Sequence, residues 1–75
     1  MKITEQIAKN TRIYRANAGL NQGELATKAG ISKAYIGKIE RGDGNITLNV
    51  LSALAKALDV TPGHLISELG LDNAA

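Results

Sequence analysis

Four places in the sequence repeat one local pattern: an apolar residue, then Asn, Ser or Thr, then a second apolar residue four positions after the polar one. The sets are Leu20-Asn21-Leu25, Ile31-Ser32-Ile36, Ile46-Thr47-Leu51 and Val60-Thr61-Leu65. A polar side chain placed in this way accepts a hydrogen bond from a free N–H of a first helical turn, and the apolar pair packs across the helix entry. The pattern therefore predicts four helix starts and restricts the chain to a largely helical fold.

The remainder of the sequence agrees with an all-α fold. Strand-like alternation is missing, and only two residues are aromatic. We expect a compact five-helix bundle with helices over residues 3–18, 22–29, 33–41, 48–58 and 62–69. Residues 1–70 are predicted to form a single domain, followed by a frayed tail over 71–75.

Composition excludes several classes of function. The chain has no Cys and a single His, His64, so disulfides, thiolate metal sites and a thiol nucleophile are excluded and no metal site is expected. No convergent catalytic set and no phosphate-cradling glycine loop is present, so we expect no enzyme activity, no cofactor and no small-molecule ligand. The apolar segments are too short to cross a bilayer and no signal peptide is evident, which favours a cytoplasmic protein of a bacterium or phage, associated with the nucleoid when bound to DNA.

Charge is distributed unevenly along the chain. Residues 1–41 carry eight of the nine Lys and Arg against three Glu, a net charge of +5, whereas residues 42–75 carry one Lys against four acidic residues, a net charge of −3. Such asymmetry favours a positive face directed toward a polyanion, although a solvated mixture of surface charges would look the same.

The stretch from Gln22 to Arg41 has the pattern of a helix-turn-helix. Ala26 is small enough for two helices to cross closely, and Gly30 stands where the turn between them requires a left-handed backbone. This spacing is more specific than that of a generic helical hairpin.

The residues around this turn resemble those of a known family. The runs Gly19-Leu20-Asn21-Gln22-Gly23-Glu24-Leu25-Ala26, Ala29-Gly30-Ile31-Ser32, Tyr35-Ile36 and Ile39-Glu40-Arg41-Gly42 are similar to the lambda-repressor/Cro-like helix-turn-helix family, also called the xenobiotic-response-element family. The resemblance implies a transcriptional regulator that binds a palindromic or pseudo-palindromic operator in double-stranded DNA. Its size and its Arg41-Gly42…Asn45-Ile46-Thr47-Leu48 segment resemble restriction–modification controller proteins, with a phage-type repressor as another sub-type.

The helix from Lys33 to Arg41 is the expected recognition helix, with its N-terminal part reading bases in the major groove. Its predicted outer face consists of Lys33, Ala34, Gly37 and Lys38. The two lysines can donate to guanine, Ala34 can meet a thymine methyl, and Gly37 permits close approach to the duplex. The alternative is that the lysines are ordinary solvated side chains.

Contacts to phosphate are expected from helix ends and from the loop after the recognition helix. The candidates are Gln22, Ser32, Tyr35, Arg41, Asn45 and Thr47. Gln22 resembles a phosphate-binding Gln of the family. For three others an alternative stays open: Tyr35 can pack inward, Thr47 can serve only as a helix cap, and Arg41 can simply favour a helix C-terminus.

Two further expectations come from the resemblance. One is an ion pair between Arg15 of the first helix and Glu40 that fixes the recognition helix. The other is a homodimer, with half-sites about one helical turn apart and an interface that includes Pro62, Ile66 and Leu69. These apolar residues could instead close the core.

Partners follow from the function. Double-stranded DNA is the expected partner, and RNA polymerase is a second one if the chain activates transcription. The competing hypothesis is an antitoxin-like or other protein-interaction module that uses the helix-turn-helix for docking. Lys33, Lys38 and Gln22 favour DNA over that alternative.

Overall fold

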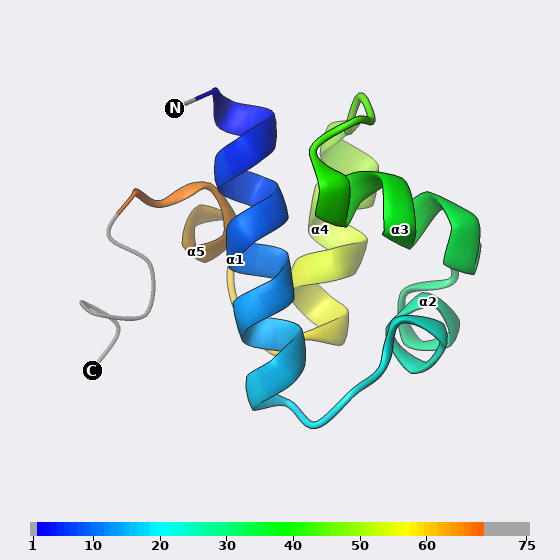
Figure 1. Cartoon of the computed structure of the whole chain (residues 1–75). Coiled ribbons are helices and arrows are strands. Elements are labelled where there is room, and N and C mark those ends of the chain that lie inside the picture. The colour runs from blue at the N-terminus through cyan, green and yellow to red at the C-terminus, as the bar shows by residue number, and fades with distance from the viewer. Residues whose placement is uncertain (1, 69–75) are drawn as a thin grey trace.

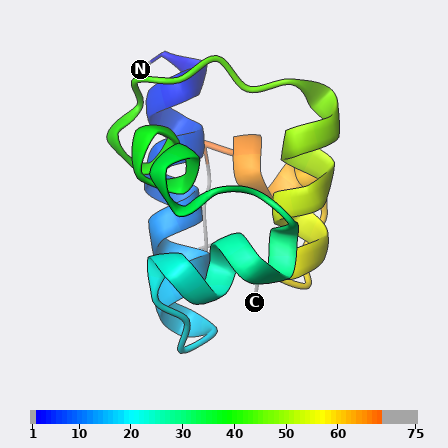
Figure 2. The same cartoon turned by 90° about the vertical axis from the view of Figure 1, so that its right-hand side faces the viewer.

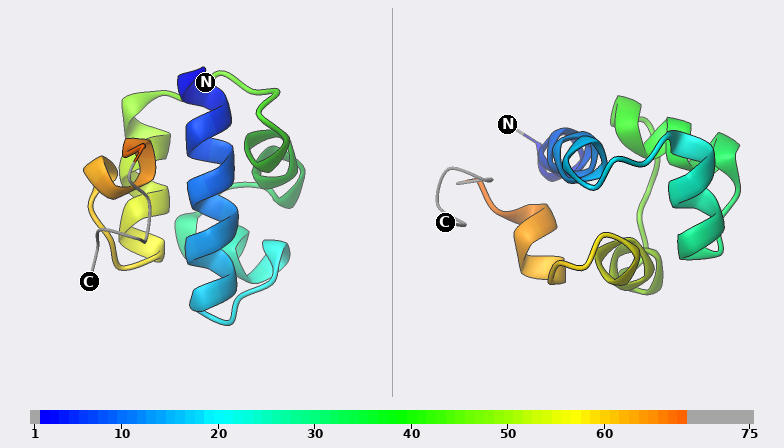
Figure 3. Two further views of the ribbon diagram at one scale, coloured as in Figure 1. Left: turned by 60° about the vertical axis from the view of Figure 1, so that its left-hand side comes forward. Right: turned by 90° about the horizontal axis from the view of Figure 1, so that it is seen from below.

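The computed structural model of the chain describes residues 2–68, and within that range it contains helices and no strands. The helices are α1 (Ile3–Asn17), α2 (Gln22–Ala29), α3 (Lys33–Arg41), α4 (Leu48–Ala57) and α5 (Pro62–Ile66) (Figure 1). Each packs against two others, so that α1, α3, α2, α4 and α5 follow one another around a closed ring. Figure 3 shows this ring from below, with α5 on one side and the α2–α3 pair on the other. The predicted all-α, five-helix fold is confirmed.

The four predicted helix starts are all present. At each one the side-chain oxygen of the capping residue accepts a hydrogen bond from the backbone N–H three residues later. The distances are 2.7 Å for Asn21, 3.1 Å for Ser32, 3.1 Å for Thr47 and 3.2 Å for Thr61. A cap of this kind stabilises a helix by about 1 kcal/mol, so these local interactions set where four of the five helices begin.

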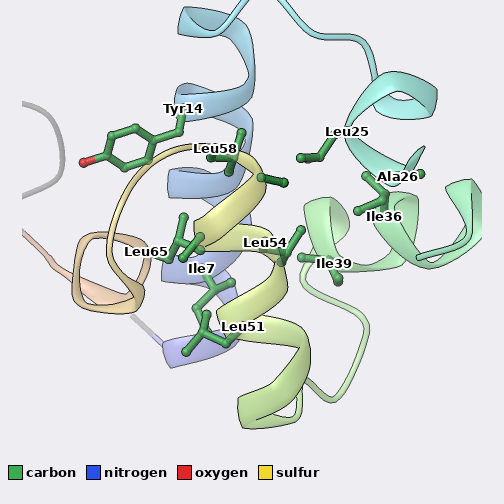
Figure 4. Packing of buried hydrophobic residues seen from close by; sticks show 12 residues of the cluster. Ile7, Tyr14, Leu25, Ala26, Ile36, Ile39, Leu51, Leu54, Leu58 and Leu65 are labelled. Carbon is green, nitrogen blue, oxygen red and sulfur yellow. The ribbon is translucent and has the colours of Figure 1, made fainter. Parts of the chain in front are cut away.

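All five helices contribute to one hydrophobic core (Figure 4). Leu25, Ile36, Leu54 and Leu65 are fully buried, and they come from α2, α3, α4 and α5. Ile7 on α1 completes the ring. Each helix therefore buries one side against the core and leaves its other side available, which allows α3 to present polar residues outward.

The predicted C-terminal end of the fifth helix, at residue 69, is wrong: α5 ends at Ile66, and Ser67 is extended. The cause is Asn10 on α1, which is 1% exposed. Its Nδ2 donates to the carbonyl oxygens of His64 at 3.2 Å, Leu65 at 2.8 Å and Ser67 at 2.9 Å. In a continuing helix the first two carbonyls would accept from N–H groups four residues later, so the side chain of Asn10 caps α5 and attaches it to α1. The first and fourth helices end one residue earlier than predicted.

Three further observations concern the described part of the chain. The predicted tail 71–75 and the predicted interface residue Leu69 lie outside it. Within residues 2–68 no helix is both long and apolar enough to cross a membrane. The same residues contain no group of three or more His, Asp or Glu that could hold a metal ion.

Replacement of Asn10 by Ala should destabilise the fold, because buried carbonyl groups at the end of α5 lose their donor. We expect the free energy of unfolding to fall by about 2–3 kcal/mol, measured by chemical denaturation followed by circular dichroism. Asn17→Ala is the matched control, since Asn17 is an exposed residue of the same helix, and it should change stability by less than about 0.5 kcal/mol. Equal effects of the two substitutions would contradict the capping role of Asn10.

Candidate nucleic-acid interface

The turn between α2 and α3 has the geometry that the sequence predicts. Gly30 adopts a left-handed backbone with φ of +70°, and the N–H of Ile31 donates to the carbonyl of Ala26 at 2.9 Å. Ala26 is buried, at 4% exposure, and its small side chain lets the two helices approach closely. As a result α2 and α3 form one outward-facing unit, and Figure 2 shows both on the side of the molecule that faces the viewer.

The exposed side of α3 carries all three predicted base contacts. Lys33, Ala34 and Lys38 are all exposed. A shallow hollow of about 470 Å³ on this side is lined by Gln22, Lys33, Ala34, Gly37, Lys38 and Arg41, and we call it the reading hollow. It brings the three predicted base-contacting residues together with two predicted phosphate contacts, and its titratable side chains are all cationic.

The prediction that Gly37 is exposed is wrong. Gly37 is buried, because the side chain of Arg41 lies over it. A Cβ atom added to Gly37 would stand 3.2 Å from Arg41 Nη1. Since Gly37 and Arg41 are one helical turn apart, the missing side chain leaves a gap that the arginine fills.

The carboxylate of Glu40 holds α3 against α1. Arg15 Nε donates to Glu40 Oε2 at 2.6 Å, and Arg15 Nη2 donates to Oε1 at 3.0 Å. The Glu40 side chain is 3% exposed and that of Arg15 is 21% exposed. Arg15 Nη1 also donates to the carbonyl of Leu20 at 3.0 Å. The pairing is therefore bidentate and partly shielded from water, a geometry that fixes orientation well.

Two more side chains converge on Glu40. Gln22 Nε2 donates to Glu40 Oε1 at 3.1 Å, and Arg12 Nη1 donates to the backbone carbonyl of Glu40. The hydrogen bonds that Arg15 donates to Glu40 raise the pKa of Arg15 above its ordinary value, against the opposing effect of burial. Sequence reasoning missed Arg12, since its acceptor is a backbone atom that carries no sequence signal.

The contacts of Gln22 leave it able to bind a second group. Only one of its two amide hydrogens is used by Glu40, and the side chain lines the reading hollow. Its backbone begins α2, where the helix dipole favours an anion. Among residues 2–68 the second amide hydrogen of Gln22 has no acceptor, so Glu40 orients this side chain and leaves it one donor.

The remaining predicted phosphate contacts have structural roles as well. Ser32 and Thr47 cap α3 and α4. The hydroxyl of Tyr35, which is half-buried, donates to the carbonyl of Asn45 at 2.7 Å, so this proton is not available to a phosphate while that bond is made. Tyr35 thereby ties the loop after α3 to the recognition helix, and the side chain of Asn45 remains exposed.

Two of the three predicted dimer contacts, Pro62 and Ile66, lie on α5, which is on the other side of α1 from α3 (Figure 1). Pro62 is exposed and Ile66 is 41% exposed, whereas Leu65 between them is fully buried in the core. Ile66 is therefore an apolar side chain that stays exposed on a helix anchored through Leu65 and Asn10.

Comparisons with known proteins agree on one family. A family model described as helix-turn-helix matches residues 12–65. The control protein C.SmaI of Serratia marcescens is 42% identical over 73 residues, which cover 97% of this chain and 87% of that protein.

Solved structures of similar proteins belong to the same group of regulators. The restriction-modification controller protein C.AhdI from Aeromonas hydrophila is 35% identical with a TM-score of 0.80, over 83% of this chain and 94% of that one. A hypothetical transcription factor from Neisseria is 33% identical with a TM-score of 0.86, over 88% of this chain and 76% of that one.

Replacement of Glu40 by Gln should destabilise the fold by removing the charge that Arg15 requires. Loss of one partner costs about 3–5 kcal/mol for a fully buried pair, and because Arg15 keeps some contact with water we expect about 2 kcal/mol. Chemical denaturation measures the change. Glu68→Gln, at an exposed position, is the matched control and should leave stability within about 0.5 kcal/mol; an unchanged stability in Glu40→Gln would refute the role of this carboxylate.

Proposed function

The chain belongs to the helix-turn-helix family of transcriptional regulators, as the sequence resemblance predicted, and we propose that it recognises a specific double-stranded DNA operator with α3 in the major groove. The observation that carries this proposal is the reading hollow, where cationic and amide side chains gather on the outer side of the recognition helix. We take residues 1–70 as one DNA-binding domain that works in the bacterial cytoplasm.

Within this proposal each residue of α3 has a distinct role. Lys33 and Lys38 donate to the O6 and N7 atoms of guanine, and Ala34 contacts the methyl group of thymine. All three are exposed on the first two turns of the helix, the part that enters the groove in this motif.

Phosphate contacts border this reading face. Gln22 donates its free amide hydrogen to the backbone of the duplex, while Ser32, Asn45 and Thr47 lie at the start of α3 and in the loop that follows it. Tyr35 supports that loop through Asn45. These contacts set the position of the helix and carry no base discrimination themselves.

A homodimer gives this small protein enough contacts for specific binding. The chain contributes one recognition helix, α3, and its backbone extends 29 Å along the longest axis, while successive major-groove sites on one side of a duplex are about 34 Å apart. One copy therefore covers one half-site. We propose that Pro62, Ile66 and Leu69 pair two copies about a two-fold axis, so that the operator is palindromic or pseudo-palindromic.

The sub-type proposed is a regulator of the controller kind. Support comes from the similarity to the control protein C.SmaI and to the controller protein C.AhdI over most of each chain. If such a regulator activates transcription, RNA polymerase is its second partner.

Replacement of both Lys33 and Lys38 by Ala should strongly reduce discrimination between the operator and other DNA. The probe is the duplex that the unmodified chain enriches from a random pool, compared with a scrambled duplex of equal composition by fluorescence anisotropy. We expect a loss of at least about 25-fold in discrimination, since each bidentate contact is worth about 1–3 kcal/mol.

Lys28→Ala with Lys56→Ala is the charge-matched control, because both lysines are exposed and neither lines the reading hollow. It should lower affinity for both duplexes alike and keep the discrimination.

Binding by the unmodified chain should weaken steeply with salt. Retained discrimination in Lys33→Ala/Lys38→Ala, or salt-independent binding, would count against DNA reading and favour a protein partner.

Replacement of Ile66 by Glu should prevent dimer formation, because a carboxylate would be placed in an apolar contact. Light scattering after size exclusion should give a dimer for the unmodified chain and a monomer for the variant, with circular dichroism unchanged. Leu48→Glu is the control, since Leu48 is 82% exposed on α4 and should keep the dimer. A monomer for the unmodified chain, or a dimer for Ile66→Glu, would overturn this interface.

A further inference from the structure

The side chain of Arg41 runs back along α3 toward the start of the helix. Residues 33, 37 and 41 follow one another at intervals of four, so they share one stripe of the helix surface. Because Gly37 has no side chain, Arg41 folds back over it, with Nη1 3.2 Å from the position of a Gly37 Cβ. One helical turn is about 5.4 Å, so the guanidinium lies about a turn nearer to Lys33 than the Arg41 backbone does.

A neighbouring carboxylate orients the guanidinium. Arg41 Nε donates to Asp43 Oδ2 at 3.2 Å, and among the hydrogen bonds of residues 2–68 this is the one that Arg41 makes. Both terminal nitrogens of the guanidinium therefore keep their hydrogens available. Each side chain is 62% exposed, so the pair adds little stability, but it engages the Nε edge of the guanidinium and leaves the two terminal nitrogens as donors.

The charge of the Arg41–Asp43 pair bears on whether the guanidinium binds a phosphate or the edge of a guanine. Arg41 and Asp43 together are neutral, and the carboxylate of Asp43 repels phosphate. The pair therefore adds little long-range attraction to a duplex, while it still presents two terminal nitrogens as donors. A guanine edge, with O6 and N7 side by side, accepts two hydrogen bonds from such a group.

We propose that Arg41 is a specificity-determining residue that reads a guanine, and that Gly37 and Asp43 are the residues that position it. This inference rests on the proposed function, and it replaces the phosphate contact expected of Arg41 with a base contact. In this inference the missing side chain of Gly37 makes room for Arg41, and it does not serve to let the duplex approach α3.

The test is a cycle of variants at constant net charge. One variant is Gly37→Ala, the second is Arg41→Ala with Asp43→Asn, and the third combines all three substitutions. Each is titrated against the duplex enriched by the unmodified chain, against versions with one G·C pair replaced at a time, and against a scrambled duplex.

Gly37→Ala should reduce discrimination at one G·C pair in each half-site by about tenfold. Its melting temperature should not fall, because Ala favours a helix over Gly and the displaced group is the far end of a flexible side chain. Arg41→Ala/Asp43→Asn should lose discrimination at the same pair, with unchanged affinity and salt dependence on the scrambled duplex. In that background Gly37→Ala should have no further effect.

Several results would overturn the inference. If Gly37→Ala keeps full discrimination at the G·C pair, Gly37 does not position Arg41. If adding Gly37→Ala to Arg41→Ala/Asp43→Asn lowers discrimination further, the glycine acts independently of Arg41 by allowing the duplex to approach α3 closely. An equal loss on scrambled DNA would assign Arg41 to phosphate. Failure of the unmodified chain to enrich any duplex would instead refute the proposed function, and this inference with it.

Discussion

The buried carboxylate of Glu40 is the constraint on which the arrangement of the reading face depends. A carboxylate that is 3% exposed must be paired, because an isolated buried charge costs several kcal/mol. Arg15 and Gln22 both donate to it, and Arg12 donates to the carbonyl of the same residue. Three helices are thereby joined at the last turn of α3, and the orientation of the recognition helix follows from satisfying one anion.

The helix α1 connects the two surfaces to which we assign function. Arg12 and Arg15 hold α3 from one part of this helix, while Asn10 holds the carbonyl groups at the end of α5 from another. The reading hollow and the exposed Ile66 therefore have a fixed relation through one rigid element. In the two-fold dimer that we propose, that relation would set the separation of the two recognition helices, and packing in the core would thereby affect the operator spacing.

Much of the fold could be predicted because its signals are local. A capping residue such as Ser32 and the apolar pair around it lie within five positions of one another. The presence of a glycine at position 30 by itself predicts the left-handed backbone there. The end of α5 could not be predicted, since Asn10 acts on carbonyls 54–57 residues away.

For the candidate site, too, local features could be predicted from the sequence and features that depend on side-chain packing could not. Exposure of Lys33 and Lys38 follows from helical periodicity, and the pairing of Arg15 with Glu40 was implied by the family resemblance. Burial of Gly37 depends on the course of a side chain four residues later, and the role of Arg12 depends on a backbone acceptor. Spacing places Gly37 and Arg41 on one stripe of the helix, but it does not say that the arginine folds back over the glycine, and a backbone acceptor leaves no trace in residue type.

The face that contacts DNA can be measured directly by titrating isotopically labelled protein with its enriched duplex and following backbone amide resonances. The account predicts the largest shifts at Gln22 and over residues 32–38 and 41–47, with small shifts on the α4 residues directed away from the reading hollow. Shifts centred on α4 and α5, with α2 and α3 unaffected, would contradict it.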